Sequence, residues 1–177
     1  TTLASKTTIA TSVRVLAHGT TVATNALIQR RGGRPALLTT AGFRDLLEIG
    51  RQTRPKIYDL KADHPEPLIP RERRLEVSER VDAKGFAIVP LTDAEIARAV
   101  AAVGTLDIDC VAVCFLFSFL NPSHEQRLGA ALRTAHPHLD VSLSSDVQPE
   151  FREYERLSTT VLNTFLQPEV GRYMARL

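Results

Sequence analysis

Glycine and hydroxyl side chains gather first at residues 18–25, in a pattern that suits the binding of an anion or a carbonyl oxygen. The run His18-Gly19-Thr20-Thr21 separates a β-branched stretch from a helical one. Glycine lets the backbone approach a ligand closely, and the free amide groups at a helix start donate hydrogen bonds to it. We therefore expect a phosphate or carboxylate site here, with Asn25 facing it from one turn further along. Ordinary N-capping by Thr20 or Thr21, with His18 merely packed, is the simpler alternative.

The segment 39–45 repeats this order of strand end, glycine and helix start. Gly42 supplies the turn, and the guanidinium of Arg44 can hold an anion through two hydrogen bonds unless it pairs with a neighbouring acid on the surface. Arg51 and Arg54 follow directly before a proline-rich segment, where their guanidinium groups can reach a phosphate or a carboxylate. The sequence thus predicts a second set of donors for an anion.

A third segment, residues 152–160, is dense in acid, base and hydroxyl groups at the start of a helix. Its candidate binding residues are Arg152, Glu153, Tyr154, Glu155, Ser158 and Thr159. Acidic residues in a first helical turn also stabilise the helix dipole without any ligand, which is the alternative interpretation. We expect the three segments to face one opening that binds an oxygen-rich ligand, so Thr20, Arg44 and Glu153 should lie close together.

Charge and motif content exclude several classes of protein. The 22 basic and 20 acidic residues leave a net charge of +2, less than a dedicated nucleic-acid-binding domain carries. The longest apolar run, residues 110–120, has 11 residues, whereas a membrane span needs about 20. The sequence contains no P-loop, Gly-x-Gly-x-x-Gly, Gly-x-Ser-x-Gly or His-Glu-x-x-His motif. We expect neither nucleic acid nor a membrane as a partner, and no self-sufficient nucleotide or zinc site.

Two cysteines, Cys110 and Cys114, lie in one run rich in valine and phenylalanine that is typical of a buried strand. Four residues of strand separate their Cα atoms by roughly 13 Å, whereas a disulfide spans about 7 Å at most. We therefore expect neither a disulfide nor a metal site from this pair. Residues 1–8 contain no hydrophobic stretch of the secretory type, which together with the free cysteines predicts a cytoplasmic location.

Strand-like and helix-like patterns alternate along the chain, which predicts an α/β fold. We expect strands at 13–17, 35–40, 110–119 and 141–144, and helices starting near residues 22, 43, 92, 121 and 153. Gly32 and Gly33 should cap the first helix with a left-handed turn, and Thr92 with Glu95 should form a capping box. Residues 75–90 indicate a β-hairpin, so we expect a mixed sheet flanked by helices, with a hairpin insertion.

Residues 1–177 are expected to form one domain, interrupted by a long surface excursion over the proline-rich residues 52–71. His124 should be an exposed residue at a helix start, and Pro168 should kink the C-terminal helix. The chain begins without methionine, which suggests a piece excised from a longer protein.

Taken together, these segments resemble the N-terminal region of the hydantoinase A and 5-oxoprolinase family. The resemblance covers most of the chain. It rests on His18 to Leu27, on Leu38-Thr39-Thr40 with Gly42 to Gln52 and Arg54-Pro55, on Phe117-Ser118 with Asn121-Pro122 and His124-Glu125, and on Arg152 to Arg156 with Ser158-Thr159-Thr160.

The resemblance implies an ATP-dependent enzyme that opens a cyclic amide such as a hydantoin or 5-oxoproline, after phosphorylating the amide oxygen. It also implies a fold similar to the actin-like, ribonuclease H-like and sugar-kinase ATPases, with ATP and Mg²⁺ as cofactors of the full-length enzyme. The partners it implies are a small-molecule substrate, a C-terminal ATPase half and a hydantoinase B-type subunit or domain. The site residues would then hold substrate or developing negative charge.

Family members begin with an Asp-x-Gly-Gly-Thr phosphate loop that does not occur in these residues. We therefore expect a domain fragment that is inactive alone and binds no cofactor alone. Two alternatives stay open: a domain of an acetone or acetophenone carboxylase-type enzyme, and a non-catalytic domain that binds an anion or a partner.

Overall fold

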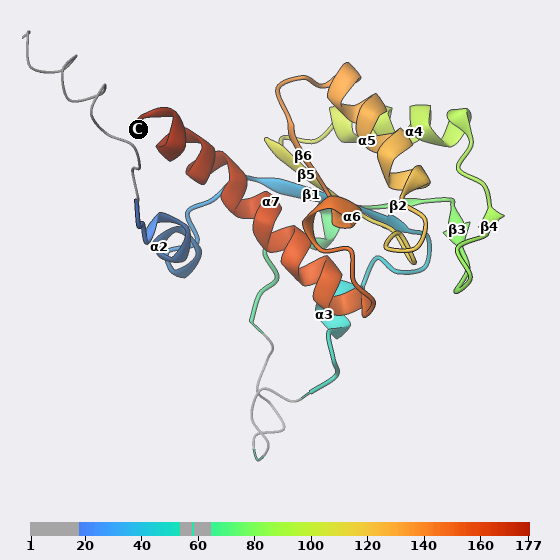
Figure 1. Cartoon of the computed structure of the whole chain (residues 1–177), viewed down its shortest axis with the longest axis horizontal. Coiled ribbons are helices and arrows are strands. Elements are labelled where there is room, and N and C mark those ends of the chain that lie inside the picture. Colours follow the sequence, from blue (N-terminus) through green and yellow to red (C-terminus); the bar gives the residue numbers. More distant parts are fainter. Residues whose placement is uncertain (1–17, 54–57, 59–64) are drawn as a thin grey trace, which may run out of the picture.

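Four parallel strands form the central sheet of the computed structural model, which describes residues 18–53, 58 and 65–177 (Figure 1). In spatial order they are β2 (Arg74–Val77), β1 (Pro35–Thr40), β5 (Cys110–Cys114) and β6 (Asp140–Leu143). Leu38 of β1 lies opposite Leu75 on one side and Val113 on the other. The expected strand 13–17 falls outside the described residues.

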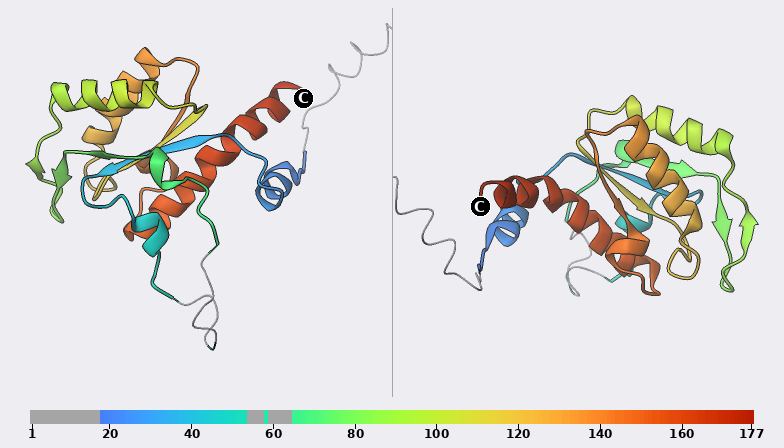
Figure 2. Two further views of the ribbon diagram at one scale, coloured as in Figure 1. Left: turned by 180° about the vertical axis from the view of Figure 1, so that it is seen from behind. Right: turned by 45° about the horizontal axis from the view of Figure 1, so that its top comes forward.

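Helices cover both faces of this sheet (Figure 2). The first face carries α4 (Asp93–Gly104) and α5 (Ser123–Ala135), and the long α7 (Glu153–Ala175) crosses the second. Because side chains alternate along a strand, Leu38 packs in the cluster beneath α4 and α5, whereas its neighbour Leu37 packs against α7. The predicted α/β class, with a sheet flanked by helices, is confirmed.

Short elements complete the domain. Three of them contact α7, namely α2 (Val22–Ile28), α3 (Leu46–Ile49) and α6 (Ser144–Val147), and a 3₁₀ turn at Arg71–Arg73 leads into β2. Sequence reasoning did not predict α6, because four residues are too short for a periodic pattern. Within the described ranges, none of the helices has the length and apolar character that crossing a bilayer requires.

The hairpin region corrects the predicted topology. Instead of pairing with the residues that follow it, β2 joins the sheet parallel to β1. The strands β3 (Arg80–Val81) and β4 (Ala87–Val89) pair antiparallel as a separate sheet. The described four-stranded sheet is therefore parallel rather than mixed. Alternating apolar residues reveal a half-buried strand but not its partner, so the pattern of β2 suits a parallel edge strand equally well.

Gly32 and Gly33 do not cap α2 as predicted, because Arg30 already adopts the left-handed conformation, with φ 49°. They allow a close approach to α7 instead. A Cβ on Gly32 would come within 2.5 Å of the Phe165 ring, and one on Gly33 within 2.7 Å of Cys110 Sγ. The Gly33 amide also donates a hydrogen bond to the Phe165 carbonyl, at 2.8 Å. The missing side chains thus let the chain pass against α7 on its way into β1.

Several predicted boundaries shift. The strand expected over 110–119 ends at Cys114, and Phe117 in the following loop has a left-handed φ of 54°. Thr92 caps α4 by accepting a hydrogen bond from the Glu95 amide at 3.2 Å. The Glu95 carboxylate does not complete the predicted capping box, because it accepts from the Ser78 amide at 2.6 Å instead.

Buried charged groups fix the carboxyl end of β5. Glu125 of α5 is fully buried and accepts hydrogen bonds from the Phe115 amide at 2.8 Å and from the Ser144 hydroxyl at 2.6 Å. Arg156 of α7 is fully buried too and donates to the Phe115 carbonyl at 2.8 Å. The end of the central strand is therefore held between an acid from one face and a base from the other.

His124 corrects another expectation, because it is 6% exposed rather than on the surface. Its Nδ1 lies 2.7 Å from Oε2 of the buried Glu79, whose other oxygen accepts a hydrogen bond from the Thr40 hydroxyl. Polar residues in a first helical turn usually face solvent. Here the connection between β2 and β3 supplies a buried carboxylate that satisfies the imidazole.

Candidate functional site

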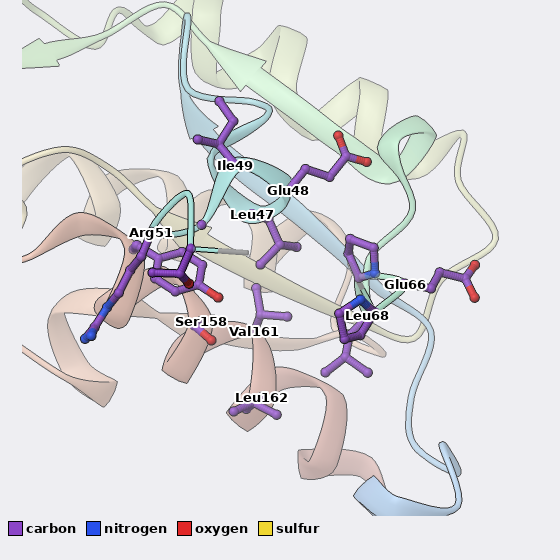
Figure 3. Close-up of a pocket in the computed structure, with 14 residues that line it drawn as sticks. Leu47, Glu48, Ile49, Arg51, Glu66, Leu68, Ser158, Val161 and Leu162 are labelled. Carbon is purple, nitrogen blue, oxygen red and sulfur yellow. The ribbon is translucent and has the colours of Figure 1, made fainter. Parts of the chain in front are cut away.

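A cavity of about 780 Å³ lies between α3, residues 65–68 and the first half of α7 (Figure 3). This volume is in the range of pockets that hold small molecules. The close-up shows side chains from all three segments around it. Its lining residues are Leu47, Glu48, Ile49, Gly50, Arg51, Thr53, Pro65, Glu66, Pro67, Leu68, Tyr154, Ser158, Val161 and Leu162.

One wall of the cavity is apolar. Leu47 of α3 and Leu68 pack against the buried cluster that contains Val161 of α7, and Leu162 lies beside them. α7 presents Ser158, Val161 and Leu162 together because residues three and four apart share a face of a helix. The wall is thus an extension of the core beneath α7.

The other end of the cavity is polar. Gly50 ends α3 with a left-handed φ of 52°, which favours glycine, and it lies beside the ring of Tyr154. Arg51 follows, and its Nε donates to Glu155 Oε1 at 2.6 Å. Tyr154 and Ser158 also line the cavity. The turn after α3 and the start of α7 therefore converge at this cavity.

Electrostatics keep the Glu155 carboxylate ionised. A hydrogen bond from its own backbone amide, and then the hydrogen bond and positive charge of Arg51, hold the pKa of Glu155 below its usual value. The side chain of Glu155 is 28% exposed and that of Arg51 is 58% exposed, so solvent screens the pair. The pair orients Arg51 and neutralises it at neutral pH.

The remaining predicted residues of this segment do not line the cavity. Arg152 precedes α7 and lies over the exposed Phe151 ring, with its Cζ 5.4 Å from the ring centroid. Glu153 is the first residue of α7, and Thr159 is exposed. Arg54 falls outside the described residues.

Gly42 and Arg44 form the predicted turn but point to a different surface. Gly42 has a φ of 88°, and its amide donates to Glu76 Oε1 at 2.7 Å. Arg44 donates to the Arg71 carbonyl at 2.9 Å, and among the described residues it neither lines the cavity nor forms an ion pair with an acid. Its neighbour Asp45 holds Arg71 instead, through two hydrogen bonds.

The segment 18–21 lies elsewhere. His18 stacks on Tyr173 near the end of α7, with ring centroids 5.7 Å apart. Glu155 and Tyr173 are separated by about 27 Å along the helix axis. The predicted common opening for Thr20, Arg44 and Glu153 is therefore wrong. Thr20 accepts a hydrogen bond from the Val22 amide at 3.2 Å within the turn before α2, whereas Thr21, the N-cap of α2, makes no side-chain capping hydrogen bond. Asn25 donates to Thr21 Oγ1 at 3.3 Å.

Sequence reasoning missed the lining residues of α3 and of the segment 65–68. Leu47, Leu68 and Leu162 appear in the sequence as ordinary core positions, and no spacing distinguishes a residue that lines a cavity from one that fills a core. For metal ions, the part of the chain that the structure describes brings together no three His, Cys, Asp or Glu side chains suited to binding one.

These observations define the chain as a doubly wound α/β domain with a ligand-sized cavity beside one of its covering helices. The domain belongs to the family described as the hydantoinase/oxoprolinase N-terminal region, whose model matches residues 1–136. The resemblance inferred from the sequence motifs is thereby confirmed.

Three characterised relatives align along most of the chain. Caprolactamase subunit alpha of Pseudomonas jessenii is 40% identical over 162 residues, covering 90% of this chain and 23% of its own. The crystal structure of that ATP-dependent caprolactamase superposes with a TM-score of 0.83 over 89% of this chain and 23% of its own. 5-oxoprolinase 1 of Arabidopsis thaliana is 38% identical over 89% of this chain and 14% of its own. The acetophenone carboxylase gamma subunit of Aromatoleum aromaticum is 32% identical over 88% of this chain and 23% of its own. The chain thus spans less than a quarter of each relative's length.

Proposed function

We propose that this chain is the N-terminal domain of an ATP-dependent enzyme that hydrolyses a cyclic amide, and that phosphorylation of the amide oxygen precedes ring opening. The likeness to caprolactamase, in both sequence and structure, carries this proposal. An amide is a poor electrophile, and converting its oxygen to a phosphate ester provides a leaving group before water attacks. We expect the isolated chain to be inactive.

In this proposal the cavity between α3 and α7 holds the substrate ring. Leu47, Leu68 and Leu162 offer apolar surface to the carbon atoms of the ring. The Tyr154 and Ser158 hydroxyls can donate to a carbonyl oxygen and accept from an amide N–H. The chain would therefore bind and orient the ring.

ATP and Mg²⁺ belong to this proposal as cofactors of the longer protein. The Asp-x-Gly-Gly-Thr phosphate loop of the family does not occur in these residues. We therefore place the nucleotide in another part of the longer protein. We also propose a hydantoinase B-type partner, since relatives carry names such as subunit alpha and gamma subunit, and a cytoplasmic location, which suits the free Cys110 and Cys114.

The test is phosphate release from ATP by the full-length protein, purified with and without its partner subunit. We expect release that depends on a hydantoin, 5-oxoproline or a lactam and that is matched by the ring-opened product. If none of these amides increased the release of phosphate, the proposal would be contradicted.

A carboxylase is the second candidate, because the match to the acetophenone carboxylase gamma subunit is of similar extent. The same assay separates the two. Phosphate release that requires both a small ketone and bicarbonate, with no response to cyclic amides, would favour the carboxylase.

A further inference from the structure

Every charged residue among the described lining of the cavity already has an ionic partner of opposite sign. These lining residues are Arg51, Glu48 and Glu66. Arg51 is bonded to Glu155 as described above, the Glu48 carboxylate lies 3.3 Å from a buried guanidinium, and that of Glu66 lies 3.8 Å from an exposed one. The three pairs are Arg51–Glu155, Glu48–Arg74 and Glu66–Arg30.

Within the described lining, this pairing leaves no cation without an acidic partner, which disfavours an anionic ligand. A ligand carboxylate would have to compete with Glu155 for the Arg51 guanidinium, and Glu155 bonds it at 2.6 Å. The lowered pKa of Glu155 means that this competitor stays charged throughout the neutral range. A second carboxylate beside Glu155 would add repulsion between like charges.

A neutral ring has no such disadvantage. Its carbon atoms would contact the apolar wall of Leu47, Leu68 and Leu162, while Ser158 and Tyr154 exchange hydrogen bonds with its amide. Neither interaction requires Arg51 to leave Glu155.

We infer that the cavity selects a neutral cyclic amide and discriminates against one that carries a carboxylate, with the Arg51–Glu155 pair as the specificity-determining element. This inference rests on the proposed function for the nature of the ring. It separates substrates such as simple lactams from 5-oxoproline.

The sharpest test compares 5-oxoproline with 5-oxoprolinamide, its neutral amide, because the two share the same ring and nearly the same size. Calorimetric titration of the full-length protein gives their dissociation constants, and phosphate release gives kcat/KM. We expect the neutral amide to bind at least tenfold more tightly. Equal binding, tighter binding of 5-oxoproline, or no binding of either ligand would overturn the inference.

Glu155→Gln tests the role of the pair directly. The variant frees Arg51, so the affinity for 5-oxoproline should rise at least fivefold while that for 5-oxoprolinamide changes less than twofold. Glu169→Gln is the matched control, because Glu169 also lies on α7 and also pairs with an arginine, Arg172, but does not line the cavity. An unchanged ratio of affinities in Glu155→Gln would rule out Arg51 as the discriminating group.

Leu162→Trp tests the location by filling the cavity from a half-buried position of α7. Loss of binding for both ligands, with an unchanged melting temperature, supports the site, and full binding contradicts it. The outcomes also separate the two proposals. Tight, selective binding without any amide-dependent phosphate release would remove the proposed function and leave the selectivity of the cavity standing.

Discussion

At the scale of single residues, the buried guanidinium of Arg156 bonds to main-chain carbonyls. Arg156 donates to the carbonyls of Phe115 at 2.8 Å and Glu150 at 3.0 Å, and its Cζ lies 5.4 Å from the centroid of the Phe119 ring. A buried guanidinium held in this way ties α7 to the end of β5 and so maintains one side of the cavity. Its role is structural, and we expect its loss to lower the free energy of unfolding more than the loss of an exposed ion pair.

We predict that Arg156→Met lowers the free energy of unfolding by about 2 to 4 kcal/mol, because the buried carbonyl of Phe115 and the partly buried carbonyl of Glu150 lose their donor. Methionine keeps most of the apolar length, so the loss reports the hydrogen bonds more than the packing. Urea unfolding measures the change. Arg172→Met is the control, since Arg172 is exposed on the same helix and should change stability by less than about 0.5 kcal/mol. Similar losses in both variants would contradict this account.

Cys114 makes stability depend on pH in the alkaline range. Burial, followed by the nearby Glu125 carboxylate, raises the pKa of Cys114 from 9.0 to about 11. The stability that the protonated thiol contributes is fully present below pH 9. Above pH 9 the thiol of the unfolded chain loses its proton, while the thiol of the folded chain keeps it. The free energy of unfolding should therefore fall by about 2 kcal/mol between pH 9 and pH 11 on account of this thiol.

Unfolding of the wild-type chain and of Cys114→Ala under reducing conditions measures this effect. The variant loses packing equally at every pH, so its curve should be lower but should decline less steeply above pH 9. Parallel curves for the two proteins would show that Cys114 ionises as readily in the fold as in the unfolded chain.

The sequence predicts Arg51, Tyr154 and Ser158 as binding residues because each lies beside a turn or a helix start. The structure places all three around one cavity, and ligand binding by them stays a prediction. The sequence predicts an exposed His124, because its buried partner Glu79 lies 45 residues away in the sequence and no local motif indicates their contact. The predicted place of His18 at the common opening is wrong, because its ring stacks on Tyr173 near the C-terminal end of α7, a contact that the local sequence does not indicate.

At the scale of elements, α7 organises the domain. The first half of α7 lines the cavity. Its second half contacts α2 and the residues Gly32 and Gly33, which lead into β1. The sequence predicts this helix and the presence of the buried β5, because long periodic or continuous apolar runs are distinctive, but it extends β5 beyond Cys114, where the strand ends. It misplaced β2, because strand pairing depends on which neighbour the chain folds beside and not on the pattern of the strand itself.

Gly32→Ala and Gly171→Ala should change stability in opposite directions. At Gly32 a methyl group would meet the Phe165 ring and carbonyl at 2.5 Å, so we expect a loss of about 1 to 3 kcal/mol. At Gly171, inside α7, nothing lies within 4 Å of the added atom, and we expect a gain of about 0.5 to 1 kcal/mol from the stiffer unfolded chain. Thermal unfolding measures both. A neutral Gly32→Ala variant would mean that α2 and α7 separate easily.

At the scale of the whole molecule, the cavity lies against the buried core between the sheet and α7. Val161 in the apolar wall of the cavity is 2% exposed and belongs to the same buried cluster as Ala112 of β5. Ala112 lies between Leu37 of β1 and Ser142 of β6, so its strand is paired on both sides. The β3–β4 hairpin is the opposite case, because β4 pairs only with β3 and all three of its residues are exposed.

Amide hydrogen exchange should therefore divide the domain into two levels of stability. We predict that the amides of Ala112 and Val161 exchange only through global unfolding, with the same free energy of opening, while those of β4 exchange through local opening at much lower cost. Exchange followed by NMR in increasing urea measures both, since globally opening amides respond to denaturant and locally opening ones do not. If Val161 exchanged as readily as β4, the wall of the cavity would have to be ordered at each binding event. Shared protection of Val161 and Ala112 means instead that the cavity is formed before any ligand arrives, so that selection between neutral and charged rings is made by a fixed arrangement of paired charges.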